Sequence, residues 1–271
     1  MRLCRAVLPL LAPRLARQLP ALARPLVPPA FAAARRSMSA AGSGGGIAVE
    51  AARAALRAAD AVCFDVDSTV IQEEGIDVLA AHCGAAEEVA ALTASAMGGT
   101  MLFQDALAAR LELIKPSRSS IDDCLEQNPL PLTPGVAELI AKLQARGTAV
   151  YLVSGGFRIM IEPVREVLSI PEANVYANTL RFAADGAYVD FDAEEPTSRD
   201  GGKPEVVRLL KEQFGYDTVV MVGDGATDMQ ARPPADAFIG FGGVAVRDAV
   251  RDGADWFVLD FDEMIAEVDS A

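Results

Sequence analysis

Residues 62–70 read Val-Cys-Phe-Asp-Val-Asp-Ser-Thr-Val. Together with Ala61 they open as an uninterrupted apolar run, which is typical of a parallel β-strand that is buried on both faces. Asp65 and Asp67 follow this run directly. Because the ligands of open α/β sheets bind at the carboxyl ends of the strands, this position predicts a functional role for the two carboxylates. The alternative is a structural strand that ends in an ordinary acidic turn.

Strand-like and helix-like patterns alternate regularly from Thr133 onward. Further strands are expected at 149–153, 175–176, 219–222, 237–239 and 256–258. Helices are expected at 133–146, from 157 onward, and at 203–214, 226–231 and 245–252. This alternation predicts an α/β fold with a Rossmann-like, doubly wound parallel sheet and right-handed crossovers. Residues 180–191 alternate around Asp185-Gly186, which predicts a small β-hairpin flap beside the site.

A block of helical sequence, residues 75–130, interrupts the α/β pattern after the first strand. Within it, apolar residues such as Leu107 and Leu111 recur at helical spacing. We interpret this block as a helical cap domain over the end of the first strand. Residues 47–74 and 131–271 then form the catalytic core, which begins with a packing helix.

The first 46 residues differ sharply in composition from the rest of the chain. No Asp or Glu precedes Glu50, whereas seven arginines lie among Ala, Leu and Pro. This acid-free, arginine-rich composition is typical of an organellar transit peptide, and a Ser-Gly-rich linker, residues 39–46, ends it. We expect delivery to a chloroplast or other plastid. The same composition also fits a mitochondrial presequence, or a basic tail that stays attached.

The overall composition argues against several other classes of protein. The chain has 271 residues, of which 51% are hydrophobic, and a formal net charge of -14. This charge disfavours nucleic acid and anionic membranes as partners, because both require a basic face. The four cysteines lie far apart and form no zinc or disulfide pattern. No apolar stretch reaches about 18 residues, so no transmembrane span is expected. The sequence leaves open whether the chain forms a homodimer.

Polar residues that suit phosphoryl transfer follow three of the expected strands, at 65–67, 154–156 and 223–228. Lys203 adds a cation just before a helix. Phosphoryl transfer needs a nucleophile, positive charge at the transferring oxygens and a proton donor for the leaving alkoxide. Aspartates, a lysine and a carboxylate-bound Mg²⁺ meet these needs. Each motif also has a structural alternative, as a tight turn, a loop or a helix start.

Several segments, in the same order, resemble one enzyme family. Residues 65–70 resemble the nucleophile motif of the haloacid-dehalogenase-type phosphatases. Residues 70–77, 96–99, 152–158 and 223–229 resemble the phosphoserine phosphatases in particular. The similarity runs from about residue 57 to the end of the chain, and several ordered blocks are far more specific than any one motif.

The resemblance implies a HAD-like core and a role for each acidic residue of the first motif. Asp65 is the expected nucleophile, which becomes a phosphoaspartate, while Asp67 protonates the leaving serine and then activates water. Lys203 is expected to neutralise charge on the nucleophile and on the phosphate. Asp65, the backbone carbonyl of Asp67, and Asp224 are the expected ligands of the Mg²⁺ cofactor.

The resemblance also implies a set of residues around the phosphate of the substrate. Ser154 and the amide of Gly155 are expected to bind the phosphate oxygens. Gly156 and Thr227 belong to the same substrate-binding set. Asp228 is expected to order the side chains around them.

The remaining expected contacts select the amino-acid part of the substrate. The resemblance places Glu74 at the ammonium group and Arg110 at the carboxylate, which a guanidinium can bind through two oxygens at once. Met97, Gly98 and Phe103 are expected to close the pocket. Charged residues on helices often cover only a solvated face, and this alternative stays open for Glu74 and Arg110.

The activity that the resemblance implies is Mg²⁺-dependent hydrolysis of O-phospho-L-serine to L-serine and phosphate. This reaction is the last step of serine synthesis by the phosphorylated route. Two alternatives stay open: a related phosphatase of another small phosphomonoester, and a non-catalytic binding protein on the same fold. Transfer of the phosphoryl group to an acceptor alcohol is a third, enzymatic alternative.

Overall fold

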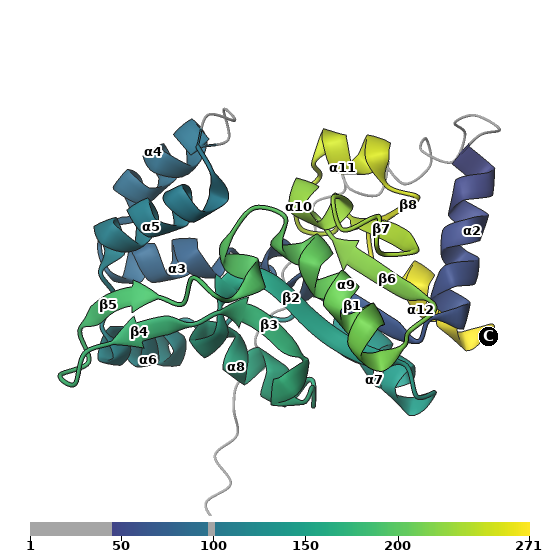
Figure 1. Ribbon diagram of the computed structural model, residues 1–271, viewed down its shortest axis with the longest axis horizontal. Coiled ribbons are helices and arrows are strands. Elements are labelled where there is room, and N and C mark those ends of the chain that lie inside the picture. Colours follow the sequence, from purple (N-terminus) through teal and green to yellow (C-terminus); the bar gives the residue numbers. More distant parts are fainter. Residues whose placement is uncertain (1–44, 97–100) are drawn as a thin grey trace, which may run out of the picture. The chain divides into compact units, whose positions relative to one another are not determined.

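The computed structural model describes residues 45–96 and 101–271. Its centre is a parallel sheet of six strands in the order β3-β2-β1-β6-β7-β8 (Figure 1). The strands of this sheet are β1 (Ala61–Phe64), β2 (Ala149–Phe157), β3 (Val175–Asn178), β6 (Val219–Gly223), β7 (Ala237–Phe241) and β8 (Trp256–Val258). The predicted α/β fold with a doubly wound parallel sheet is therefore confirmed.

Helices cover both faces of this sheet and form a separate block after the first strand. Those that flank the sheet are α2 (Gly45–Ala58), α7 (Val136–Ala145), α8 (Arg158–Val167), α9 (Gly202–Phe214), α10 (Ala226–Met229), α11 (Asp248–Gly253) and α12 (Asp262–Asp269). Those of the helical block are α3 (Gly75–His82), α4 (Ala86–Ala96), α5 (Phe103–Ile114) and α6 (Arg118–Gln127). Within the described ranges, no helix combines the length and apolar character needed to cross a membrane.

The central strands are apolar at successive positions because both of their faces are buried. In β1, Val62 and Phe64 belong to the core cluster that includes α2, α7, α8 and α12. Ala61 and Cys63 belong to the cluster on the opposite face, with α9 and α11. All four of these side chains are 0% exposed, so the apolar run read from the sequence reflects two cores that share one strand.

The structure corrects the predicted end of β2. The apolar pattern predicts a strand that ends at residue 153, but β2 continues through the glycines to Phe157. Its register against β3 shifts between Val153 and Phe157, so this part of the strand is irregular. The next helix consequently begins at Arg158. Gly155 and Gly156 therefore lie within a strand rather than in the tight turn that was the structural alternative.

Other boundaries differ by a few residues, and α12 was not predicted. The helix expected from residue 133 begins at Val136, because Gly135 adopts a left-handed conformation with φ of 86°. The helices expected at 226–231 and 245–252 are shorter or later, as α10 and α11. In α12, Met264 and Val268 form a buried apolar pair one turn apart, and half of the residues of this helix are acidic, which masks the helical pattern.

The predicted hairpin is present as β4 (Leu180–Phe182) and β5 (Tyr188–Phe191). Its turn contains Gly186 with φ of 84°, as the Asp-Gly signal requires. Leu180 and Phe191 share a hydrophobic cluster with α3, α5 and α6. The N–H of Arg118, at the start of α6, also donates to the carbonyl of Gly186. The hairpin thus packs against the helical block (Figure 1).

The predicted transit peptide, residues 1–46, lies almost entirely outside the described residues. The described chain begins with α2, which contacts α12. Glu267 of α12 is 7% exposed and accepts hydrogen bonds from Arg53 and Arg57 of α2. The guanidinium of Arg53 also lies 4.7 Å from the centroid of the Trp256 ring. These contacts join the first described helix to the last.

We expect Glu267→Ala to lower the free energy of unfolding by about 1–3 kcal/mol, because hydrogen bonds to a buried carboxylate are lost and two arginines are left facing each other. Urea denaturation followed by circular dichroism measures this. Glu212→Ala is the matched control, since Glu212 pairs with Arg208 on the exposed side of α9. Equal unfolding midpoints for the two variants would contradict a structural role of the α2–α12 contact.

Candidate active site

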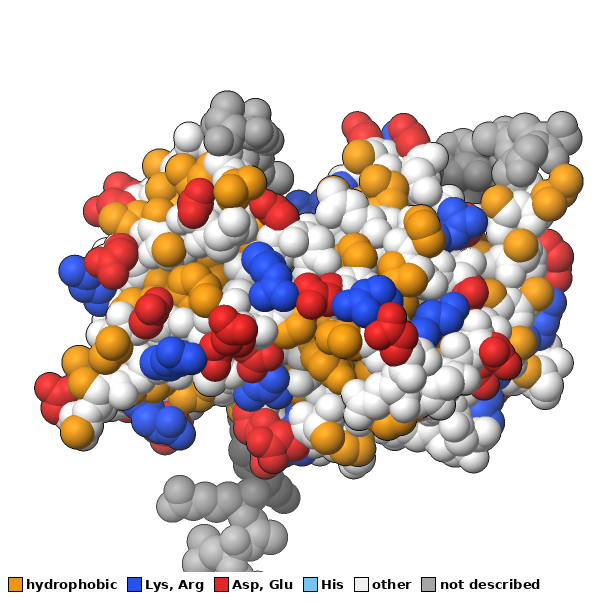
Figure 2. All heavy atoms as spheres, in the orientation of Figure 1, with side chains coloured by type: hydrophobic (Ala, Val, Ile, Leu, Met, Phe, Trp, Pro, Cys, Tyr) orange, Lys and Arg blue, Asp and Glu red, His pale blue; other side chains and the backbone are white. Residues whose placement is uncertain are grey.

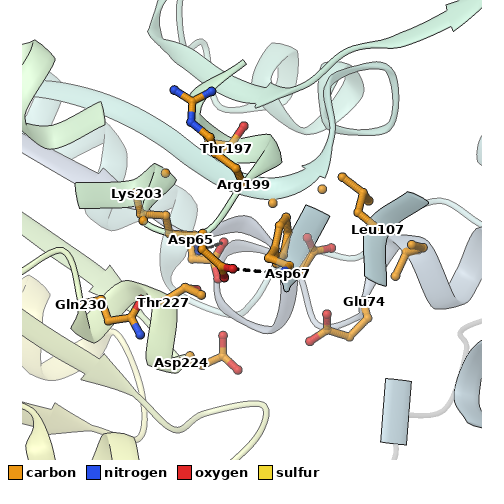
Figure 3. A pocket seen from close by; sticks show the side chains of 18 of the residues that line it. Asp65, Asp67, Glu74, Leu107, Thr197, Arg199, Lys203, Asp224, Thr227 and Gln230 are labelled. Carbon is orange, nitrogen blue, oxygen red and sulfur yellow. Dashed lines mark hydrogen bonds and ion pairs between the residues drawn. The ribbon is translucent and has the colours of Figure 1, made fainter. Parts of the chain in front are cut away.

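Asp65 directly follows β1, and Asp67 lies in the tight turn after it, Val66–Val70, where Asp67 and Ser68 have non-helical backbone angles. Within this turn Ser68 adopts a left-handed conformation, with φ of 53°. The N–H of Val66 donates to Oδ1 of Asp65 at 2.8 Å, which holds the carboxylate against its own backbone. Figure 3 shows the side chains of Asp65, Asp67 and Asp224 around one pocket at this edge of the sheet.

A buried lysine joins three of the chain segments that meet at this pocket. Nζ of Lys203, near the start of α9, lies 2.8 Å from Oδ1 of Asp65 and 2.5 Å from Oδ1 of Asp228. Burial alone would lower the pKa of Lys203, but the charges of Asp228 and Asp65 outweigh it, so the pKa is raised. Lys203 therefore stays charged beside the carboxylate of Asp65.

Asp67 has a different environment from Asp65, although the two are neighbours on one turn. Its Oδ1 accepts from the N–H of Gly75 at 2.7 Å, and its Oδ2 accepts from the hydroxyl of Ser154 at 3.3 Å. Burial, with the negative charges of Asp65 and Glu74, raises the pKa of Asp67 to about 7. A carboxyl with this pKa can hold a proton near neutral pH and give it up.

Three carboxylates form the candidate metal site of the described residues. One oxygen each of Asp65, Asp224 and Asp228 lies within 4.8 Å of the other two. Such a set of hard oxygen donors fits Mg²⁺. Asp228 was expected only to order its neighbours, and it also bonds Lys203 and the N–H of Gly225 at 2.9 Å. The carboxylate of Asp67 points away from this set, to Gly75 and Ser154.

Arg247 links the candidate metal site to Glu74, the residue just before the helical block, and the sequence patterns did not single out Arg247. Its Nε lies 2.8 Å from Oδ2 of Asp224, and its Nη2 lies 3.3 Å from Oε1 of Glu74. Glu74 also accepts from the hydroxyl of Ser68 at 2.8 Å. Burial raises the pKa of Glu74, and the charge of Arg247 acts against this rise. In the sequence, the Gly-Gly pair after the expected strand 237–239 indicates the loop that carries Arg247, and this was the available signal.

The pocket encloses about 200 Å³, which is below the roughly 300–1,000 Å³ of pockets for drug-sized ligands. It suits a small molecule. Predicted site residues that line it are Asp65, Asp67, Glu74, Phe103, Arg110, Gly155, Gly156, Lys203, Asp224 and Thr227. Lining residues that were not predicted include Ile76, Leu107, Thr197, Arg199, Asp200, Gln230 and Arg247.

The remaining predicted site residues are Ser154, Asp228, Met97 and Gly98. Ser154 and Asp228 are 0% exposed and do not line the pocket, but each bonds a residue that does. Met97 and Gly98 lie outside the described residues. The positions of these two residues in the pocket therefore stay predictions.

The helical block contributes one wall of the pocket through α5. The ring of Phe103 lies so close to β2 that a Cβ on Gly155 would be 2.9 Å from its Cζ. The N–H of Phe103 donates to Oδ2 of Asp200 at 3.2 Å, which ties α5 to the segment before α9. Arg110 faces the same pocket, and its Nε donates to the carbonyl of Ala106 at 3.1 Å. Burial lowers the pKa of Arg110, against the charges of Asp77 and Glu74.

Gly223, the last residue of β6, leaves room for Asp228. A Cβ at this position would lie 2.2 Å from Cγ and 2.7 Å from Cβ of Asp228, whose side chain is fully buried. We expect Gly223→Ala to lower the free energy of unfolding by about 1–3 kcal/mol, since an overpacked core must shift. Thermal unfolding measures the loss. Gly46→Ala is the control, because its Cβ meets nothing within 4 Å. An unchanged melting temperature for Gly223→Ala would contradict the tight packing.

Comparisons with known proteins identify the family of the chain. A family model for the haloacid dehalogenase-like hydrolases matches residues 59–236. "Phosphoserine phosphatase" of Bos taurus is 54% identical over 211 residues, which cover 78% of this chain and 94% of that protein. "Phosphoserine phosphatase, chloroplastic" of Arabidopsis thaliana is 51% identical over 215 residues, which cover 79% of this chain and 73% of that protein.

A solved structure has the same fold over most of the chain. It is described as a phospho-aspartyl intermediate analogue of phosphoserine phosphatase. The two structures match with a TM-score of 0.67 and 28% identity, over 77% of this chain and 98% of that one. The chain therefore belongs to the haloacid dehalogenase-like hydrolase family and, within it, to the group of the phosphoserine phosphatases.

Proposed function

We propose that this chain is an Mg²⁺-dependent phosphatase that hydrolyses O-phospho-L-serine to L-serine and phosphate. The main support is the placement of Asp65 between a charged lysine and a second carboxyl that can hold a proton. The curated relatives with 51–54% identity that carry the name phosphoserine phosphatase support the choice of substrate.

In the proposed reaction, Asp65 and Asp67 divide the chemistry. A carboxylate oxygen of Asp65 attacks phosphorus, the bond between phosphorus and the serine oxygen breaks, and Asp67 gives its proton to that oxygen. Asp67 then accepts a proton from water as the water oxygen attacks phosphorus. Phosphate leaves, and the Asp65 carboxylate is restored. A proton donor for such a poor leaving group contributes about 10²- to 10⁴-fold to the rate.

Positive charge in the pocket balances the charge of the transferring phosphoryl group. Lys203 is held by two carboxylates and contributes a fixed cation beside Asp65. Asp65 and Asp224, with the backbone carbonyl of Asp67, are the proposed ligands of Mg²⁺, which when bound neutralises negative charge on the phosphate oxygens. Ser154 and the glycines that follow it are proposed to orient the phosphate.

Two charged residues, one just before the helical block and one within it, are proposed to select the amino-acid part of the substrate. Glu74 and Arg110 both line the pocket, and they carry the charges that complement an ammonium and a carboxylate. Phe103, with Met97 and Gly98, is proposed to cover the substrate. We accordingly propose that residues 75–130 are a cap domain and that 47–74 and 131–271 are the catalytic core.

The proposed location is a plastid. The arginine-rich, acid-free residues 1–46 have the composition of a transit peptide. The relative from Arabidopsis thaliana is named chloroplastic, which supports a plastid over a mitochondrion. There the proposed reaction would complete serine synthesis by the phosphorylated route.

The proposed function is tested by phosphate release from the chain that begins at residue 47. The substrates are O-phospho-L-serine and a panel of sugar and nucleotide phosphates, with Mg²⁺ or with EDTA. We expect Mg²⁺-dependent release with a strong preference for phosphoserine. Asp65→Asn should abolish release, because an amide is not a nucleophile, while circular dichroism shows the same fold.

Each other outcome favours one of the alternatives. Equal release from all substrates would support a phosphatase of another small phosphomonoester. No release from a folded sample would support a binding protein. Serine formed without an equal amount of free phosphate, in the presence of an alcohol, would support phosphotransfer. Full activity of Asp65→Asn would contradict the proposed nucleophile.

We expect Arg110→Ala to reduce kcat/KM for phosphoserine by about 10- to 100-fold, chiefly through KM, because a charge-assisted contact with the carboxylate is lost. Hydrolysis of p-nitrophenyl phosphate, which has no carboxylate, should change much less. Arg118→Ala is the matched control, since Arg118 is exposed on α6 and does not line the pocket. Equal losses on both substrates would contradict the role of Arg110.

A further inference from the structure

Asn178 is a fully buried side chain that connects two walls of the pocket. It ends β3 and is 0% exposed. Its Nδ2 donates to the carbonyl of Gly155 at 2.7 Å, and its Oδ1 accepts from the hydroxyl of Thr197 at 3.0 Å. A carbonyl only accepts hydrogen bonds, so the amide has to present its nitrogen to Gly155 and its oxygen to Thr197.

On the first wall, a series of hydrogen bonds connects Asn178 to the carboxyl group of Asp67. The peptide bond between Gly155 and Gly156 is planar, so a bond that holds its carbonyl also fixes the direction of its N–H. This N–H donates to Oγ of Ser154 at 2.8 Å, and the same hydroxyl donates to Oδ2 of Asp67 at 3.3 Å. Through this planar peptide group, the hydrogen bond from Asn178 therefore helps to fix the position of Asp67, the proposed acid.

This peptide needs such a contact because the regular strand pairing does not hold it. The register between β2 and β3 shifts between Val153 and Phe157, so Gly155 lies in the irregular part of the strand. Glycine also has more conformational freedom than any other residue. A side chain at this place would not fit, since a Cβ on Gly156 would lie 2.8 Å from Oδ2 of Asp67.

On the second wall, Asn178 contacts Thr197, which lies in the segment before Lys203. Thr197 lines the pocket and is only 4% exposed. The segment that it belongs to folds tightly onto the start of α9, where a Cβ on Gly202 would lie 2.1 Å from the carbonyl oxygen of Pro196. Lys203 is the next residue. Asn178 thus holds the segment that carries the lysine to the strand that carries the glycines.

We infer that Asn178 is a positioning residue for the proposed reaction, which aligns Asp67 through the Gly155–Gly156 peptide. The inference rests on the proposed function, because Asp67 has to act there as the proton donor. If the proton donor is misplaced, hydrolysis slows most for a substrate whose leaving group needs that proton. The alkoxide of serine is such a leaving group, whereas p-nitrophenolate leaves without protonation.

The test compares kcat/KM for O-phospho-L-serine with kcat/KM for p-nitrophenyl phosphate in the Mg²⁺-loaded enzyme. We expect Asn178→Ala to lower the ratio of these two constants by about tenfold or more, since a misplacement of about 1 Å can cost 10²-fold. Asn174→Ala is the matched control. Asn174 also donates an amide hydrogen to β2, at 2.9 Å from the carbonyl of Val150, but at the other end of the strand. It should lose stability without a change in the ratio.

A second variant keeps the test decisive if Asn178→Ala does not fold. Thr197→Val conserves volume and removes only the hydroxyl that holds Oδ1 of Asn178, so the ratio should fall in the same direction by a smaller factor, and Thr197→Ser should restore it. Ratios equal to that of the wild type in folded variants would overturn the inference. A wild-type enzyme that releases no phosphate from phosphoserine would overturn the proposed function and the inference with it.

Discussion

The structure of the site depends on the ion pairs of a buried lysine with two aspartates. Lys203 lies between Asp65, which directly follows β1, and Asp228, which lies in α10 after β6. Burying one of these charges alone would cost several kcal/mol, so each is tolerated only because the others are present. The sheet order places β1 next to β6, while the chain leaves β1 towards β2 on its other side. This reversal in strand order is where open α/β sheets bind their ligands.

Different surroundings give two neighbouring aspartates different chemistry. Asp65 faces a fixed cation, whereas Asp67 contacts a backbone N–H and a hydroxyl. Separate environments for two carboxyls are a general way to obtain a nucleophile and an acid from one residue type. The formal charge of -14 does not by itself prevent the binding of a phosphate, because four basic residues line the pocket beside its five acidic ones. On the face drawn in Figure 2, basic and acidic side chains are interspersed.

The sequence predicted those parts of the molecule whose signals are local. The apolar run before Asp65 indicated a strand buried on both faces, and the strand ends indicated where polar residues meet. Asp65, Lys203 and Asp224 converge as the resemblance implied. The contacts of Asn178 and Arg247 were not predictable from local sequence, since each depends on segments that are distant in the chain. The glycines of β2 read as a turn because their close packing against Phe103 and Asp67 exists only in the folded protein.

The central claim is that Asp65 carries the phosphoryl group, and trapping that group on the protein tests the claim most directly. The enzyme with Mg²⁺ is mixed with ³²P-labelled O-phospho-L-serine, quenched in acid within one turnover, reduced with borohydride and digested for mass spectrometry. The account predicts acid-stable, hydroxylamine-sensitive label, and conversion of residue 65 alone to homoserine. Label on another residue, or turnover without any label on the protein, would contradict it.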